Sequence, residues 1–367
     1  MMPATQTAAP VRARGAERFG RSAIDRPALL FLPLGMAMGP RGLNVLPESL
    51  LAFLDPAVSA ALATLGALAG LGLYRDRRRE PALLTSVLVD VGLAIVAVGG
   101  CAAAVWRATG LGLDSTWIAA ACLAVAAVAS TPGTRSAAHP FAALIVRIGE
   151  LGTAIAIVLG ALALAWLRHL SPGASLLLTA ELCAIAAMIG LAGWLLAGQT
   201  SDDNEQRVFA AGTVLLLGGA AEYLAASALF LGFVAGACWR VMGGAAGERM
   251  TRDLEYLQHP LVVLLLIIAG AKCDFSAGAM ALVAAYVLCR TGAKLASGFV
   301  VSRLASIGRP LALGLHLLPT GVIGVAFALN LVAAWSNPAA PLILDILVLG
   351  TLLSELLAIT NAPREAA

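Results

Sequence analysis

The sequence predicts an all-α, multi-pass membrane protein, and three observations support this fold class. Of the 367 residues, 60% are hydrophobic and 12% are charged, which is about half the charged fraction of a typical soluble domain. Apolar runs of about 17–25 residues, the length of a membrane-spanning helix, recur along the whole chain. Alanine and glycine are abundant, with 38 glycines, and small residues let membrane helices pack closely.

The apolar runs predict about twelve transmembrane helices. We expect these spans near residues 27–39, 57–74, 83–106, 115–131, 141–166, 174–197, 207–221, 225–241, 257–275, 278–302, 310–333 and 341–360. They make one transmembrane domain, 27–361. It follows a basic N-terminal segment, 1–26, and precedes a short tail, 362–367.

The positions of the basic residues predict the orientation, because Lys and Arg are enriched in cytoplasmic loops. With twelve spans and an inside N-terminus, most arginines outside the spans lie on the inside. The outside loops hold few basic residues: Arg41, Arg107, Arg168 and Lys272. Both termini are therefore expected to be cytoplasmic, in the cell inner (plasma) membrane.

The sequence also excludes several classes of function. It has no Ser/His/Asp, metal-binding or phosphate-binding constellation, so we expect neither an enzyme nor a cofactor. The six cysteines lie in or beside apolar segments without metal-ligand spacing, which is typical of buried core residues. No basic patch or aromatic platform is present, so nucleic-acid binding is not expected.

Two apolar spans are interrupted by short segments that contain both proline and glycine. The fourth span ends in ASTPGTRSA, with Ser130, Thr131 and Pro132, and the eleventh contains Pro319, Thr320 and Gly321. Proline removes a helical hydrogen bond, and unwound backbone within a bilayer must be buried or line a cavity. The two spans run in opposite directions, one in each half of the chain. This pairing favours inverted repeats whose broken helices flank a binding site.

Ionisable residues inside spans are candidate functional groups, because burying charge in a membrane is costly. Glu150 lies near the middle of the fifth span, where its carboxylate can bind either a proton or a cation. The hydroxyls of Thr131 and Thr320 can add oxygen ligands. Arg290 and Lys294 lie four residues apart on one face of the tenth span. They can pair with Glu150 or hold the broken helices together.

Alternatives to this interpretation remain open at the level of sequence. Arg147 is three residues before Glu150 and can neutralise it. His316 and Asn330 flank the second break and are weaker candidates for the pathway. Weaker acidic candidates near the span ends, where side chains can reach the interface, are Asp90, Glu181, Asp345 and Glu355.

Several segments resemble the monovalent cation:proton antiporter superfamily, the membrane domain of the sodium/hydrogen exchangers. LFLPLGMAMGPRGLNVLP resembles an early Gly-Pro segment of that family, and ASALFLGFVAGACW resembles its ALGAFLAG segment. VLCRTGAKLASG is similar to its Arg- and Lys-bearing helix, and LHLLPTGVIGVAFAL to its second crossing helix. The family usually has Asp-Asp or Asn-Asp where this chain has Gly149-Glu150, and a longer half-helix and loop where only about eight residues separate Pro132 from Pro140 here. The resemblance therefore implies a first half of the site that is shortened and altered.

The resemblance implies a homodimer whose fourth and eleventh helices cross near the bilayer centre, and exchange of protons for Na⁺ or K⁺. It places Glu150 at the family's ion-binding acid and Thr131 and Thr320 at the crossing. Two alternatives stand beside this function. One is a non-transporting or regulatory membrane protein with the same fold, and the other is an organic-anion transporter that binds its substrate with Arg290 and Lys294.

Overall fold

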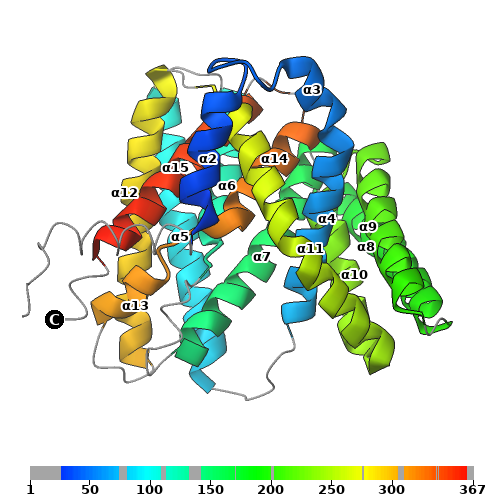
Figure 1. Ribbon diagram of the computed structural model, residues 1–367. Helices are drawn as coiled ribbons and strands as arrows, with labels where there is room; N and C mark the ends of the chain where they lie inside the picture. The colour runs from blue at the N-terminus through cyan, green and yellow to red at the C-terminus, as the bar shows by residue number, and fades with distance from the viewer. Residues whose placement is uncertain are drawn as a thin grey trace, which may run out of the picture.

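The protein is a bundle of α-helices, as the computed structural model in Figure 1 shows. The structure describes residues 26–73, 81–108, 113–131, 142–169, 171–199, 202–274, 277–304, 310–335, 337 and 339–361. The basic segment that precedes Arg26, the tail 362–367 and Pro132 lie outside the described residues.

Each span expected from the sequence coincides with one helix, except that 310–333 is divided in two. The helices are α2 (Pro27–Met38), α3 (Glu48–Phe53), α4 (Asp55–Gly72), α5 (Pro81–Ala108), α6 (Leu113–Val128), α7 (Ala142–His169), α8 (Pro172–Gln199), α9 (Asp203–Tyr223), α10 (Ala228–Met242), α11 (Gly244–Ala271), α12 (Ala277–Leu304), α13 (Pro310–His316), α14 (Gly321–Ala334) and α15 (Ala339–Asn361).

Two helical features differ from the expectation. The short helix α3 was not expected, and α11 begins at Gly244 instead of near residue 257. Gly243 and Gly244 both have positive φ angles, 61° and 75°, a conformation that glycine adopts readily. They allow the chain to turn sharply from α10 into α11, so the polar residues after the turn join the helix.

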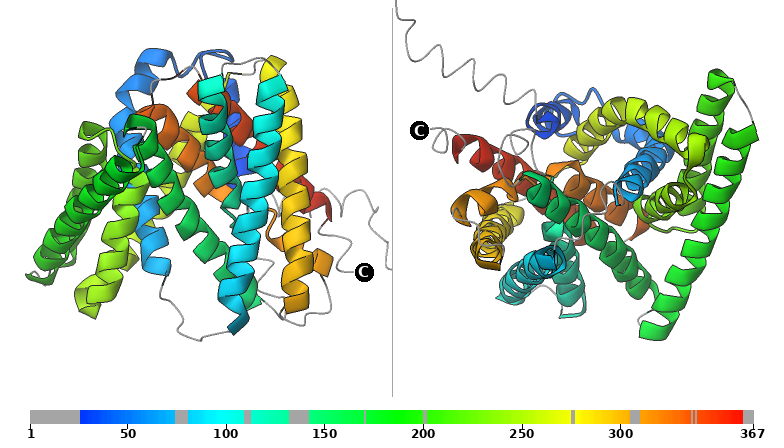
Figure 2. Two further views of the ribbon diagram at one scale, coloured as in Figure 1. Left: turned by 180° about the vertical axis from the view of Figure 1, so that it is seen from behind. Right: turned by 90° about the horizontal axis from the view of Figure 1, so that it is seen from below.

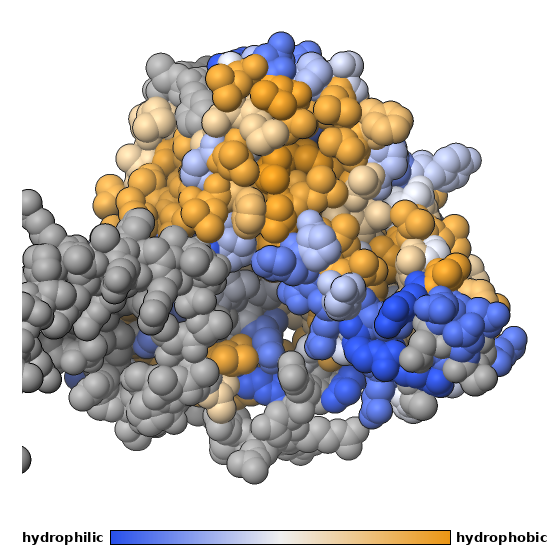
Figure 3. All heavy atoms as spheres, viewed as in Figure 1, coloured by the Kyte–Doolittle hydropathy of each residue, from blue (hydrophilic) through white to orange (hydrophobic). Residues whose placement is uncertain are grey.

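The described helices include seven that are long and apolar enough to cross a membrane, and four shorter apolar helices. Figure 3 shows apolar residues over a broad upper and middle part of one face, with hydrophilic residues gathered near the lower ends of α10 and α11. Such a surface suits a protein whose middle contacts lipid and whose ends contact water. The chain is a multi-pass membrane protein.

The helices group around the buried helix α14. At one side α5 packs against both α6 and α12, and at the other α4, α9, α10 and α11 pack together. The view from below in Figure 2 separates these two sets. Residues 323–331 of α14 are all buried, so this interrupted helix lies at the centre of the protein, where it can contribute to a site.

The packing of α4 against α10 depends on glycine. A Cβ atom at Gly66 or Gly232 would overlap the backbone of the facing helix, at Leu229 or Ala63. Small residues of this kind let helix backbones approach closely in a membrane.

We expect Gly232→Ala to destabilise the protein by about 1–3 kcal/mol, the usual cost of overpacking a close-packed interior. The midpoint of thermal unfolding in detergent measures the change. Gly212→Ala on α9 is the matched control, because a Cβ there meets nothing within 4 Å. Equal midpoints for the two variants would contradict the assignment of this contact.

Candidate functional site

The two interrupted segments lie side by side. Helix α6 ends at Val128 and α13 ends at His316, and α14 begins at Gly321. The backbone N–H of Thr131 donates a hydrogen bond to the carbonyl of Pro319 at 3.0 Å. The two breaks therefore meet as expected, and the eleventh span is divided into α13 and α14. The continuation of the fourth span beyond Thr131 lies outside the described residues.

Gly321 has a φ angle of 63°, and a Cβ at this position would overlap the side chain of Thr131. Glycine therefore serves two needs here, because it permits the left-handed backbone and leaves room for the facing threonine. Thr320 is 1% exposed, and its hydroxyl has no hydrogen-bond partner among the described residues.

Arg290 joins the two broken helices. Its Nη1 donates to the carbonyl of Leu318 and its Nη2 donates to the carbonyl of Ala129 at 2.9 Å. Both carbonyls lie just beyond the carboxyl end of a helix, where backbone acceptors lack helical partners and the helix dipole is negative. A fully buried guanidinium thus satisfies acceptors from both breaks.

Lys294 supports the same crossing from one turn away. Its Nζ donates to the carbonyl of Val128 at 3.1 Å and forms an ion pair of 2.7 Å with Asp90 on α5. Both side chains of this pair are buried, at 0% and 1% exposure. Arg290 therefore contacts both breaks, whereas Lys294 contacts only the first. Lys294 pairs with Asp90, a weaker acidic candidate from the sequence, and not with Glu150.

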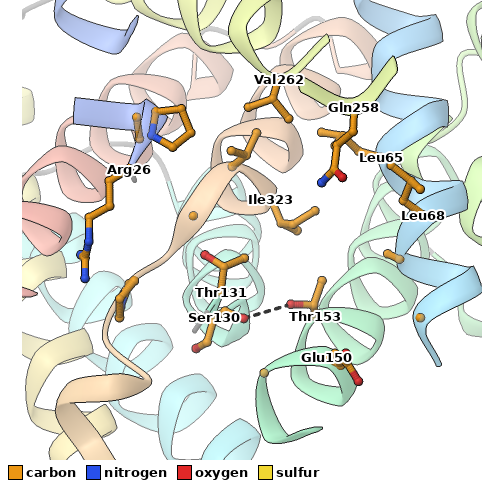
Figure 4. Close-up of a pocket in the computed structure, with 18 of the residues that line it drawn as sticks. Arg26, Leu65, Leu68, Ser130, Thr131, Glu150, Thr153, Gln258, Val262 and Ile323 are labelled. Carbon is orange, nitrogen blue, oxygen red and sulfur yellow. Dashed lines mark hydrogen bonds between the residues drawn. The ribbon is translucent and has the colours of Figure 1, made fainter. Parts of the chain in front are cut away.

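A cavity of about 520 Å³ lies beside the crossing and is shown in Figure 4. Thr131 and Pro319 line it at the crossing, and Glu150 lines it from α7. Its polar lining side chains are Arg26, Ser130, Thr131, Glu150, Thr153, Glu255, Gln258 and Glu355. The structure thus brings Glu150, Ser130, Thr131, Pro319 and Gly321 together at one cavity.

Glu150 lies one helical turn from the crossing. Thr153, on the next turn of α7, donates from its hydroxyl to the carbonyl of Ser130 at 3.5 Å, as Figure 4 shows. The Glu150 side chain is 32% exposed, and the distance from its Oε2 to the Nη1 of Arg147 is 3.8 Å. Glu150 therefore lines the cavity, and its carboxylate is also within reach of Arg147.

Five other candidates do not line this cavity: Thr320, His316, Asn330, Arg290 and Lys294. His316 is the last residue of α13. The Oδ1 of Asn330 accepts a hydrogen bond from the backbone N–H of Ala228 at 3.0 Å, which holds the start of α10 against α14.

Several residues of the cavity were not among those predicted from the sequence: Thr153, Arg26, Glu255 and Gln258. Thr153 is one turn after Glu150, so helical spacing from that acid could have indicated it. Arg26 immediately precedes α2, and Glu255 and Gln258 lie within α11, in and just after its polar first half, where charged and polar residues carry no distinguishing signal.

Comparison with known proteins supports the fold. No family model and no curated protein matches the chain. Among solved structures, it is similar to the sodium proton antiporter MjNhaP1 from Methanocaldococcus jannaschii, with a TM-score of 0.65 and 16% sequence identity. The match covers 94% of this chain and 99% of the antiporter. The chain therefore has the fold of a sodium/proton antiporter.

Proposed function

We propose that the protein is a secondary transporter that exchanges protons for a monovalent cation, Na⁺ or K⁺, by alternating access. The observation that carries this proposal is the acid-lined cavity beside two crossed helix breaks. Crossed broken helices are where transporters of this architecture bind ions. The sodium and proton specificity of the structural neighbour supports the same class of substrate.

Glu150 carries the exchanged ion in this proposal. Its carboxylate binds either a proton or a hard cation, and the two compete because they use the same oxygen atoms. Thr131 contributes oxygen ligands from the crossing, and Thr320 lies directly beside it. Arg290 and Lys294 act indirectly. Arg290 holds the two breaks together, and Lys294 holds the first break against α5.

The burial of Arg290 and Lys294 argues against organic-anion transport. Neither side chain lines the cavity, and each is fully buried with protein acceptors. A substrate anion would have to displace these internal partners. The proposal also includes a homodimer in the cell inner membrane with both termini cytoplasmic, supported by the family resemblance and the distribution of arginines.

Glu150→Gln is expected to abolish exchange, because glutamine keeps the size of the side chain and loses the titratable charge. The assay follows dissipation of a pH gradient in proteoliposomes after addition of Na⁺, K⁺ or Li⁺. Glu181→Gln is the matched control, since that acid is exposed on α8 and does not line the cavity. Full activity in the Glu150 variant would reject its role, and absence of cation-dependent flux in the unaltered protein would reject the function.

A further inference from the structure

Besides Glu150, the cavity is lined by two carboxylates that exchange through Glu150 does not use, Glu255 on α11 and Glu355 on α15, and Glu355 is the one bonded to the crossing. Its side chain is 5% exposed, whereas that of Glu150 is 32% exposed. The Oε1 of Glu355 accepts a hydrogen bond from the backbone N–H of Gly321 at 3.4 Å. Glu355 therefore lies at the amino end of α14, at the crossing itself, where the helix dipole favours negative charge.

Arg26 provides the opposite charge. Its Nη1 is 2.5 Å from the Oε2 of Glu355 and also donates to the backbone carbonyl of that residue at 3.3 Å. Arg26 immediately precedes α2, and it lines the same cavity as Glu355. In Figure 4 it lies across the cavity from Glu150. Glu355 and Glu150 thus have different cationic neighbours, Arg26 and Arg147 respectively.

The position of the guanidinium is one that a transported cation could take. A buried carboxylate needs a compensating positive charge, because an isolated charge is costly at low dielectric. Arg26 supplies that charge now, but its long side chain can withdraw by bond rotation, since the side chain is 16% exposed. A proton or a metal cation that enters the cavity could then neutralise Glu355 in its place.

We propose that Glu355 is a second cation-binding carboxylate of the transport site, and that Arg26 is a tethered cation that competes with the transported ion for it. This inference rests on the proposed exchange function. On this inference, Arg26 before α2 and Glu355 on α15 help to set the half-maximal cation concentration for exchange.

The test measures the half-maximal concentration of Na⁺, K⁺ or Li⁺ for exchange by the full chain in proteoliposomes. Arg26→Gln is expected to lower it about three- to fivefold, the range that corresponds to a modest ion-pair energy. Arg26→Lys keeps the charge and should stay near the unaltered value. Glu355→Gln should raise the half-maximal concentration or abolish exchange, and Arg26→Gln should have no further effect in that background.

Arg303→Gln is the control, because Arg303 is exposed at the end of α12, away from the cavity. Cation-dependent thermal stabilisation in detergent gives a second readout that needs no transport. An unchanged half-maximal concentration in Arg26→Gln overturns the proposal. If that variant does not fold, an unchanged value in Glu355→Gln overturns it. These outcomes differ from failure of the proposed function, in which the unaltered protein itself shows no cation-dependent flux.

Discussion

Lys294→Met is expected to destabilise the protein by about 3–5 kcal/mol, the cost of breaking a buried ion pair by removing one partner. Lys294 and Asp90 are both almost fully buried, and their charged atoms are 2.7 Å apart. The Oδ1 of Asp90 has no hydrogen-bond partner among the described residues. Loss of the ammonium therefore leaves a carboxylate with little compensation, and also removes the bond to the carbonyl of Val128.

Denaturant titration of the purified protein in detergent measures the free energy of unfolding. Lys272→Met is the matched control at the chain's other lysine, whose 2.6 Å pair with Asp55 is partly exposed. Exposed pairs contribute about 0–1 kcal/mol, so this control should change little. The double variant Asp90→Asn with Lys294→Met should recover much of the loss, because neither position of the pair then carries an uncompensated charge. Similar losses in both single lysine variants would show that burial of the Lys294 pair is unimportant.

Arg290→Met is expected to destabilise the crossing by about 2–6 kcal/mol, because it leaves two buried carbonyls without a donor at about 1–3 kcal/mol each. The two acceptors belong to different breaks, at Ala129 and Leu318. Because Arg290 helps to hold the two breaks in place, we expect exchange activity to fall together with stability. Arg290→Lys should recover only part of the loss, because an ammonium lacks the rigid fork of a guanidinium.

The same unfolding titration and the proteoliposome assay measure both effects. Arg303→Met is the control on the same helix, because Arg303 is exposed and stacks over Phe299 at 5.2 Å. Its loss should be within about 1 kcal/mol, the usual contribution of an exposed cation–π contact. If Arg290→Met were as stable as this control, the bridging contacts would not hold the breaks together.

Most of the helices could be predicted from the sequence, because a bilayer imposes a local rule on length and hydropathy. The break at Pro319 was also predictable, because proline disrupts its own turn of helix whatever surrounds it. The start of α11 was predicted less well. The polar residues 244–256 carry no apolar signal, and helix α11 continues through them from the turn at Gly243.

The candidate site was predictable in part. Glu150 and Thr131 were identified from intramembrane charge and a helix break, and the structure places both at the cavity. The partner of Lys294 could not be identified from the sequence, because 204 residues separate it from Asp90. Asn330 illustrates the same limit. Its proximity to the break suggested the pathway, yet its amide holds the start of α10.

The sequence by itself determined a multi-pass helical protein with two interrupted spans and a small set of buried charges, because each of these features depends on the local chain. Only the tertiary structure decided which charges meet. It paired Lys294 with Asp90, directed Arg290 to two carbonyls, and brought Arg26 from the start of α2 to Glu355 in the last helix. The physical reason is that a long charged side chain takes the partner that helix packing brings within reach, and packing depends on the whole bundle.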